Sequence, residues 1–231
     1  NFARDLVNEA PNVLHSEGYA KTIEADVKKN LKGGKVKTLG KAELKKEKMN
    51  LFLSVNAGSA YGPRLVHLTY TPKKATKNTK HIAMVGKGLT FDTGGYSLKP
   101  GGAMMGMKFD MAGSATVYGA FRAAVLNNSP YKITCILGMT DNAVSSTATM
   151  PDSIVKARNG LNVEILNTDA EGRLLLADAI ELANEYKPEL IIDIATLTGQ
   201  AEDIFGGKAA VVVGDNKVCE LLKKIGTEID E

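Results

Sequence analysis

From residue 81 onward, short apolar runs alternate with helical segments, and this alternation restricts the possible folds more than any other feature. The apolar runs cover residues 81–85, 132–139, 162–166, 190–195 and 209–213. The helical segments cover residues 112–126, residues 172–186 and the region from Lys217. Runs that are apolar at nearly every position are typical of strands buried on both faces. We therefore predict an α/β fold with a mostly parallel, mixed central sheet and helices on both faces.

The first 80 residues are predicted to add further elements to the same domain. Residues 16–29 have apolar side chains at helical spacing. Residues 35–39 and 64–70 have the pattern of half-buried strands. Residues 41–48 predict a short polar helix, and residues 72–80 a polar connection.

Several features favour a cytoplasmic protein with no membrane partner. The chain lacks an apolar run of about 18 residues, the length that a spanning helix needs. The segment from Asn1 to Asp5 resembles neither a signal peptide nor a transit peptide. Cys135 and Cys219 form no disulfide framework and no metal-binding spacing. Cys135 lies in an apolar run and is expected in the core.

The charge is unevenly distributed along the chain. Residues 1–80 carry 16 lysines and arginines against 7 acidic residues, whereas residues 81–231 carry 13 against 19. A basic lobe can attract nucleic acid. However, these lysines are scattered and few aromatic residues lie between them. We therefore expect a solvated helical face and no nucleic-acid partner.

Four segments place charged residues beside glycines, after a predicted strand or before a predicted helix. They are residues 85–95, 97–100, 107–113 and 167–174. Each also has a purely structural interpretation. Thr168 and Glu171 match a capping box, Asp110 a helix cap, and Gly94 a turn. Lys87 lies between two glycines but lacks the spacing of a phosphate-binding loop.

Taken together, the carboxylates of these segments indicate a metal site. Asp92, Asp110, Asp169 and Glu171 are predicted on loops at the strand carboxyl ends, where sites form in such sheets. So many carboxylates would repel one another without cations, and oxygen-rich clusters suit divalent metals. A pair of metals is a known arrangement for hydrolysis. The histidines all lie outside these segments.

The same segments carry a family resemblance. Residues 167–174 (NTDAEGRL) and 85–95 (VGKGLTFDTGG) resemble the signatures of the cytosolic leucyl aminopeptidase family. The Asp110 segment, residues 193–199 and residues 6–12 are similar to further blocks of that family. The similarity extends from the first residue to about Gly214.

The resemblance implies two divalent cations per subunit. One would be held by Asp92, Asp169 and Glu171, and the other by Lys87, Asp92, Asp110 and Glu171. Lys87 can ligate only as a neutral amine, so we expect adjacent cations and burial to lower its pKa. Zinc or manganese is expected, and this ligand set also admits magnesium or cobalt.

The resemblance further implies the catalytic and substrate-binding residues of an aminopeptidase. Lys99 would stabilise the oxyanion formed at the scissile carbonyl. Arg173 would hold a bicarbonate ion that acts as the general base. The side-chain pocket would be formed by Met107, Thr196, Leu197 and Gly199. The implied substrates are peptides with a free N-terminus, and the preferred terminal residue is leucine-like.

The resemblance also makes predictions about the whole subunit. Residues 1–231 would be a catalytic domain that stops short of the family's usual C-terminal end, and the family's small N-terminal non-catalytic domain would be absent. The family forms homo-hexamers, so a homo-hexamer is expected. One departure is local: family members usually have Pro-Gly-Asp where this chain has Met150-Pro151-Asp152-Ser153.

Two other functions match parts of the sequence. Asp92-Thr93-Gly94 matches the catalytic tripeptide of aspartic peptidases, but a single-chain enzyme needs a second triplet, and the α/β pattern does not suit that all-β fold. A non-catalytic DNA-binding or scaffolding subunit of the same fold would suit the basic first 80 residues. It would not require Lys99 or Arg173, so the complete residue set favours an enzyme.

Overall fold

The computed structural model describes residues 1–229, which form two compact units. The first unit comprises residues 1–196, and the second begins at Leu197. The candidate site residues up to Thr196 belong to the first unit. In the described residues, no helix combines the length and apolar character that crossing a membrane requires.

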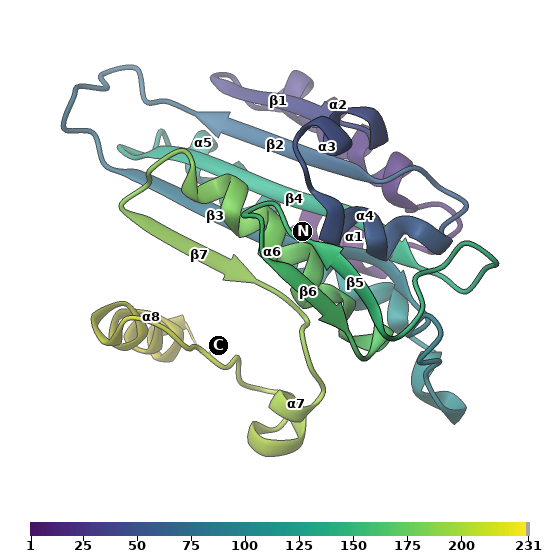
Figure 1. Cartoon of the computed structure of the whole chain (residues 1–231). Helices are drawn as coiled ribbons and strands as arrows, with labels where there is room; N and C mark the ends of the chain where they lie inside the picture. The colour runs from purple at the N-terminus through teal and green to yellow at the C-terminus, as the bar shows by residue number, and fades with distance from the viewer. Residues whose placement is uncertain (230–231) are drawn as a thin grey trace. The chain divides into compact units, whose positions relative to one another are not determined.

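A five-stranded mixed sheet organises the first unit (Figure 1). Its order is β1-β2-β4-β3-β7. The strands are β1 (Gly34–Leu39), β2 (Arg64–Tyr70), β3 (His81–Asp92), β4 (Lys132–Asn142) and β7 (Leu190–Ile194). The pairs β3–β4 and β3–β7 are parallel, whereas β2 is antiparallel to both of its neighbours. Four of the five strands therefore run in one direction, which confirms the predicted mostly parallel, mixed sheet.

Helices cover both faces of this sheet, as predicted. One apolar cluster joins one face to α1 (Phe2–Asn8), α2 (Ser16–Asn30) and α5 (Ala112–Leu126). The other joins the opposite face to α3 (Lys41–Lys46), α4 (Asn50–Val55) and α6 (Glu171–Asn184). In β2, Val66 and Leu68 belong to the first cluster and Leu65 to the second, as the alternation of side chains along a strand requires. Cys135 is buried in the first cluster, as expected. The sequence analysis did not identify α1 or α4.

Strand β3 is longer than the sequence indicated. The prediction ended the strand at residue 85 and placed a glycine-rich loop after it, whereas β3 continues to Asp92. Glycines serve close packing here. A Cβ on Gly86 would lie 2.5 Å from the Cα of Ser114, and one on Gly88 would lie 2.4 Å from the Gly138 carbonyl oxygen. The missing side chains therefore admit helix α5 and strand β4 close to the backbone of β3.

The run at residues 162–166 was predicted as a central strand, and this was wrong. It forms β6 (Asn162–Ile165), which pairs with β5 (Ser153–Lys156) in a separate two-stranded antiparallel sheet. Ile165 is buried, but Asn162 and Glu164 are exposed, so β6 is covered on one side only. Asp152 precedes this hairpin with a φ of 67°. This left-handed backbone favours glycine.

The second unit contains α7 (Gln200–Phe205) and α8 (Asn216–Ile229). Helix α8 confirms the helix predicted from Lys217. The strand predicted at residues 209–213 is not formed. A strand needs a neighbouring strand to satisfy its backbone N–H and C=O groups, and the described part of this unit supplies only helices. Short 3-10 helices complete the described chain, at Asn56–Gly58, Gly101–Met104, Met107–Met111 and Thr168–Ala170.

Candidate active site

The carboxyl ends of parallel strands bring the predicted acidic residues together. Asp92 is the last residue of β3, and the paired strand β4 ends at Asn142. Asp110 lies in the 3-10 helix before α5. Asp169 lies in the 3-10 helix before α6, and Glu171 is the first residue of α6. The four acidic residues thus come from three segments that are far apart in the sequence.

Three of these carboxylates form a compact group. Asp92, Asp169 and Glu171 each place an oxygen within 4.8 Å of the others. Asp92 and Glu171 are buried, whereas Asp169 is half-buried and open to solvent. The group is therefore reachable from outside but largely enclosed by protein. The fourth carboxylate, Asp110, is connected to this group through a lysine.

Two lysines each join a pair of carboxylates. The Lys87 Nζ lies 2.8 Å from Asp110 Oδ1 and 3.1 Å from Glu171 Oε1. It also donates a hydrogen bond to the carbonyl oxygen of Thr196, at 2.8 Å. The Lys99 Nζ lies 2.8 Å from Asp92 Oδ2 and 2.6 Å from Asp169 Oδ1. Lys87 therefore contacts two of the other predicted metal ligands, whereas Asp92 and Asp169 are joined by Lys99, which is not one of the predicted ligands.

Burial dominates the electrostatics of the acidic residues. It raises the pKa of Asp110 to about 7, although the Lys87 ammonium opposes this shift. Burial also raises the pKa of Glu171 above its ordinary value, against the same lysine. Carboxyl groups with raised pKa values in a cleft are frequent at functional sites. Ionisation of these buried carboxyl groups costs free energy unless positive charge beyond that of the two lysines lies nearby.

At the two lysines, the neighbouring carboxylates outweigh the effect of burial on the pKa. Burial alone would lower the pKa of Lys87, but Asp110 and Glu171 outweigh it and the pKa lies above its ordinary value. The pKa of Lys99 is likewise raised, because its hydrogen bonds to Asp169 and Asp92 outweigh the effect of burial. The lowered pKa expected for Lys87 applies beside two cations. With carboxylates as its charged neighbours, the pKa of Lys87 is raised instead, and adjacent cations would act in the opposite direction.

The residues present fit divalent cations. Among residues 1–229, four carboxylates face two ammonium groups, so the group carries excess negative charge. Asp110 Oδ2 is buried and has no hydrogen-bond partner among residues 1–229. A buried carboxylate oxygen without a partner is unusual in a folded protein. Carboxylate oxygens are also the ligands that hard divalent cations prefer. The group could therefore hold metal ions.

The helix-capping interpretations of Glu171 and Asp110 are wrong. In a capping box, Glu171 would accept a hydrogen bond from the backbone N–H of Thr168. That N–H instead donates to Ser97 Oγ, and Glu171 faces Lys87. Asp110 caps no helix, because helix α5 has no side-chain cap and Asp110 accepts hydrogen bonds from Lys87 and Thr196. The side chains are thus directed at one another rather than at helix ends.

Glycines shape the space around the two lysines. A Cβ on Gly172 would lie 2.7 Å from Lys87 Cε and 2.9 Å from its Nζ. Gly94 has a φ of 85°, and a Cβ there would lie 2.4 Å from the Ser97 carbonyl oxygen and 3.1 Å from Asp169 Oδ1. The glycines beside the charged residues are therefore required by close packing.

The remaining predicted site residues lie in different surroundings. Arg173 is exposed in the first turn of α6 and forms no hydrogen bond or ion pair with the described residues. Met107 is half-buried and begins the 3-10 helix that carries Asp110. Thr196 Oγ1 donates to Asp110 Oδ1 at 2.8 Å. Leu197 and Gly199 are exposed and belong to the second unit.

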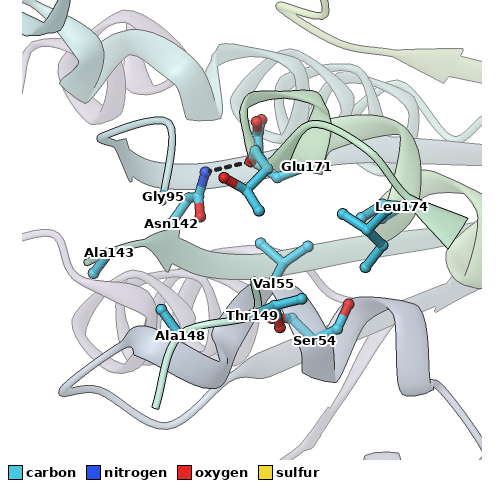
Figure 2. A pocket seen from close by; sticks show the side chains of 11 residues that line it. Ser54, Val55, Gly95, Asn142, Ala143, Ala148, Thr149, Glu171 and Leu174 are labelled. Atoms are coloured by element: carbon cyan, nitrogen blue, oxygen red, sulfur yellow. Dashed lines mark hydrogen bonds between the residues drawn. The ribbon is translucent and has the colours of Figure 1, made fainter. Parts of the chain in front are cut away.

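One polar residue of the site was missed by the sequence analysis. Asn142 is buried and donates hydrogen bonds to Asp92 Oδ1 at 2.8 Å and to the Thr168 carbonyl oxygen at 3.0 Å. Its position shortly after the apolar run at residues 132–139 was the available signal. Figure 2 shows Asn142 beside a small cavity that Glu171 and Gly95 also line. The cavity has a volume of about 10 Å³, so it has room for about one water and none for a peptide side chain.

Comparison with known proteins identifies relatives along the whole chain. A cytosol aminopeptidase of Pseudomonas aeruginosa is 45% identical over 96% of this chain. A probable cytosol aminopeptidase of Pseudomonas fluorescens is 43% identical over 100% of the chain, and one of Streptomyces avermitilis is 44% identical over the same share. The chain spans less than half of their lengths, 45%, 46% and 44% respectively.

A family match agrees with these similarities and with the carboxylate group described above. Residues 1–231 match the family described as "Cytosol aminopeptidase family, catalytic domain". The chain therefore belongs to the cytosol aminopeptidase family, whose catalytic domain it matches from its first residue to its last.

Proposed function

We propose that this chain is the catalytic part of a metal-dependent aminopeptidase that removes the N-terminal residue, preferably leucine-like, from peptides. The observation that carries this proposal is the group of four carboxylates, Asp92, Asp110, Asp169 and Glu171, with excess negative charge at the strand carboxyl ends. Family membership supports the activity, and the geometry supports the use of cations.

Two groups of ligands would hold two divalent cations. Asp92, Asp169 and Glu171 would hold one cation, and Lys87, Asp92, Asp110 and Glu171 the other. Bound at such a site, divalent cations polarise a carbonyl and lower the pKa of a bound water. Zinc or manganese is the proposed metal, and magnesium or cobalt would also suit oxygen ligands.

Lys99 would supply positive charge to the reacting carbonyl. Its ammonium lies among the carboxylates but is more exposed than Lys87, with 14% of its side chain accessible against 3%. It is therefore placed to meet a substrate oxygen that becomes negatively charged during attack by water. Such fixed positive charge stabilises an oxyanion more than the neutral carbonyl that precedes it.

Arg173 would bind a bicarbonate ion that accepts the proton of the attacking water. The exposed guanidinium is not engaged by any described residue, so it is available to an anion. It lies in the first turn of α6, where the helix dipole also favours negative charge. In this proposal Arg173 positions the base, and the base receives the proton.

Substrate selection would depend on residues beside the carboxylates. We assign the leucine-like side chain to a pocket that includes Met107, which supplies apolar surface, and Thr196, which is hydrogen-bonded to Asp110. Leu197 and Gly199 complete the proposed set by family resemblance. We further propose a cytoplasmic homo-hexamer, since the relatives are named cytosol aminopeptidases and the family resemblance implies that assembly.

The decisive experiment is hydrolysis of leucine amide by the protein at its natural length. Activity should disappear with a chelator and return when manganese or zinc is added. Asp169→Ala and Lys99→Ala should both abolish it. Arg4→Ala, at an exposed position in α1, is the control and should retain activity. Activity that is indifferent to the chelator would refute the proposed mechanism.

A further inference from the structure

Asn142 connects two of the segments that carry the acidic residues. Its side-chain amide has two N–H donors. One donates to Asp92 Oδ1, at the end of β3, and the other to the carbonyl oxygen of Thr168, the residue before Asp169. The backbone carbonyl oxygen of Asn142 accepts hydrogen bonds from the backbone N–H and the hydroxyl of Thr93. A single buried residue thus joins the end of β4 to both segments.

The side-chain amide of Asn142 also determines which carboxylate oxygen of Asp92 is available to a cation. Asp92 Oδ1 accepts from Asn142 Nδ2 at 2.8 Å and from the Gly94 backbone N–H at 2.9 Å. A carboxylate oxygen has two lone pairs for such bonds, so Oδ1 is fully used. Oδ2 faces the Lys99 ammonium and accepts from no uncharged donor in the described chain. Asp92 therefore presents Oδ2 to positive charge.

The packing around Asn142 leaves it little freedom. Gly95 has a φ of 64°, and a Cβ there would lie 2.9 Å from Thr168 Oγ1 and 3.1 Å from Asn142 Oδ1. Thr168 Oγ1 itself donates to the Gly94 carbonyl oxygen. Gly95 and Asn142 both line the small cavity behind Glu171 (Figure 2). The two loops and the end of β4 are therefore in close contact.

We propose that Asn142 is the positioning residue of the metal site: its amide holds Asp92 by Oδ1, so that Oδ2 is the oxygen that ligates. This rests on the proposed function, because it assumes that Asp92 is a metal ligand. Asn142 touches neither cation nor substrate and acts through Asp92 and through the loop that carries Asp169. Groups that orient metal ligands in this way typically contribute about 10- to 100-fold in metal affinity or activity.

The chain offers a matched control in Asn56. This residue is also buried, and its Nδ2 donates at 2.9 Å to the Tyr61 carbonyl oxygen and at 3.0 Å to Thr140 Oγ1. It contacts none of the acidic residues of the site. Replacing either asparagine by alanine removes two side-chain hydrogen bonds of similar length from a buried residue. Only the replacement of Asn142 releases Asp92.

The test compares Asn142→Ala and Asn56→Ala in the protein at its natural length. Manganese affinity is measured by titration calorimetry, thermal stability in the presence of a chelator, and leucine amide hydrolysis at saturating metal. Both variants should lose similar thermal stability. Asn142→Ala should weaken manganese binding about 10- to 100-fold, whereas Asn56→Ala should bind as the wild type does. Asn142→Ser, which keeps one donor, replaces Asn142→Ala if the latter does not fold, with the same expected direction.

The outcomes separate this inference from the proposed function. Equal manganese affinities for both variants, in a wild type that binds manganese and is active, would overturn the role of Asn142 alone. A wild type that neither binds divalent metal nor hydrolyses leucine amide would overturn the proposed function and this inference with it. A selective loss of affinity in Asn142→Ala would support both.

Discussion

Replacing Gly172 by alanine should inactivate the protein without removing any charged group. The added Cβ would lie 2.7 Å from Lys87 Cε and 2.9 Å from Nζ. Ordinary contacts of this kind begin near 3.4 Å, so Cε must move by at least about 0.7 Å. The obstructed atoms are the end of a flexible side chain, so the lysine moves rather than the helix. Movement takes Nζ away from Asp110 and Glu171, its partners at 2.8 and 3.1 Å.

The expected effects on activity and stability differ in size. A displacement of about 1 Å in a catalytic group can cost about 100-fold in rate, so we expect a loss of that order in leucine amide hydrolysis. Crowding a packed position costs about 1–3 kcal/mol. The preference of helices for alanine over glycine offsets about 1 kcal/mol of this. The net change of up to about 2 kcal/mol corresponds to a fall of no more than about 8 °C in the melting temperature.

Gly119→Ala is the matched control for this variant. It makes the same substitution inside helix α5, where the new Cβ would meet only the Cβ of Ala3, at 3.4 Å. It should retain wild-type activity and metal affinity. Gly172→Ala should lose activity and bind manganese more weakly while remaining folded. Wild-type activity in Gly172→Ala would refute the requirement for Lys87 at its observed position.

Three further predictions follow from other contacts. Lys99→Met should abolish activity yet tighten manganese binding in calorimetry, because the ammonium competes with cations for Asp92 and Asp169; weaker binding would contradict this. Burial raises the pKa of Asp26, but hydrogen bonds from a tyrosine, an asparagine and an arginine outweigh it, so the pKa lies below 3.8. The stability of the wild type over Asp26→Asn, about 1–3 kcal/mol at neutral pH, should therefore persist above about pH 4 and shrink in more acidic solution; a difference independent of pH would count against it. Asp152→Gly should raise the unfolding free energy by about 1 kcal/mol in urea, because Asp152 has a φ of 67°; an unchanged midpoint would show that this backbone is not strained.

Much of the fold could be predicted because its signals are local. Strand β2 has the predicted bounds, and α2, α5 and α6 differ from the predictions by no more than two residues at either end. In these helices the apolar spacing matches the face that packs on the sheet. The wrong strand predictions concern which strand a segment pairs with, rather than the local composition of the segment. Residues 162–166 form a strand but pair with β5, and residues 209–213 have strand-like composition without a strand beside them.

The sequence indicated which acidic residues would lie close together, but not which side chains would contact one another. The acidic residues were identified because carboxylates next to glycines at strand ends are recognisable in the sequence. Which carboxylates each lysine joins depends on contacts between segments far apart, such as Lys87 with Asp110 and Glu171. Asn142 was missed for the same reason, since one asparagine after a strand has no distinctive pattern. Its importance is visible only in the acceptors that it reaches.

The surroundings of the two lysines give a physical reason for their different proposed roles. Lys87 extends from a central strand, is 3% exposed, and is held by two carboxylates and the Thr196 carbonyl oxygen, with Gly172 packed against it. Lys99 lies on a loop after β3, is 14% exposed, and has only carboxylates as ammonium partners in the described part of the chain. A cation that binds those carboxylates removes the attraction that holds Lys99, whereas Lys87 keeps its carbonyl partner and its packing. A fixed amine suits a ligand, and a releasable ammonium suits a group that must turn toward substrate.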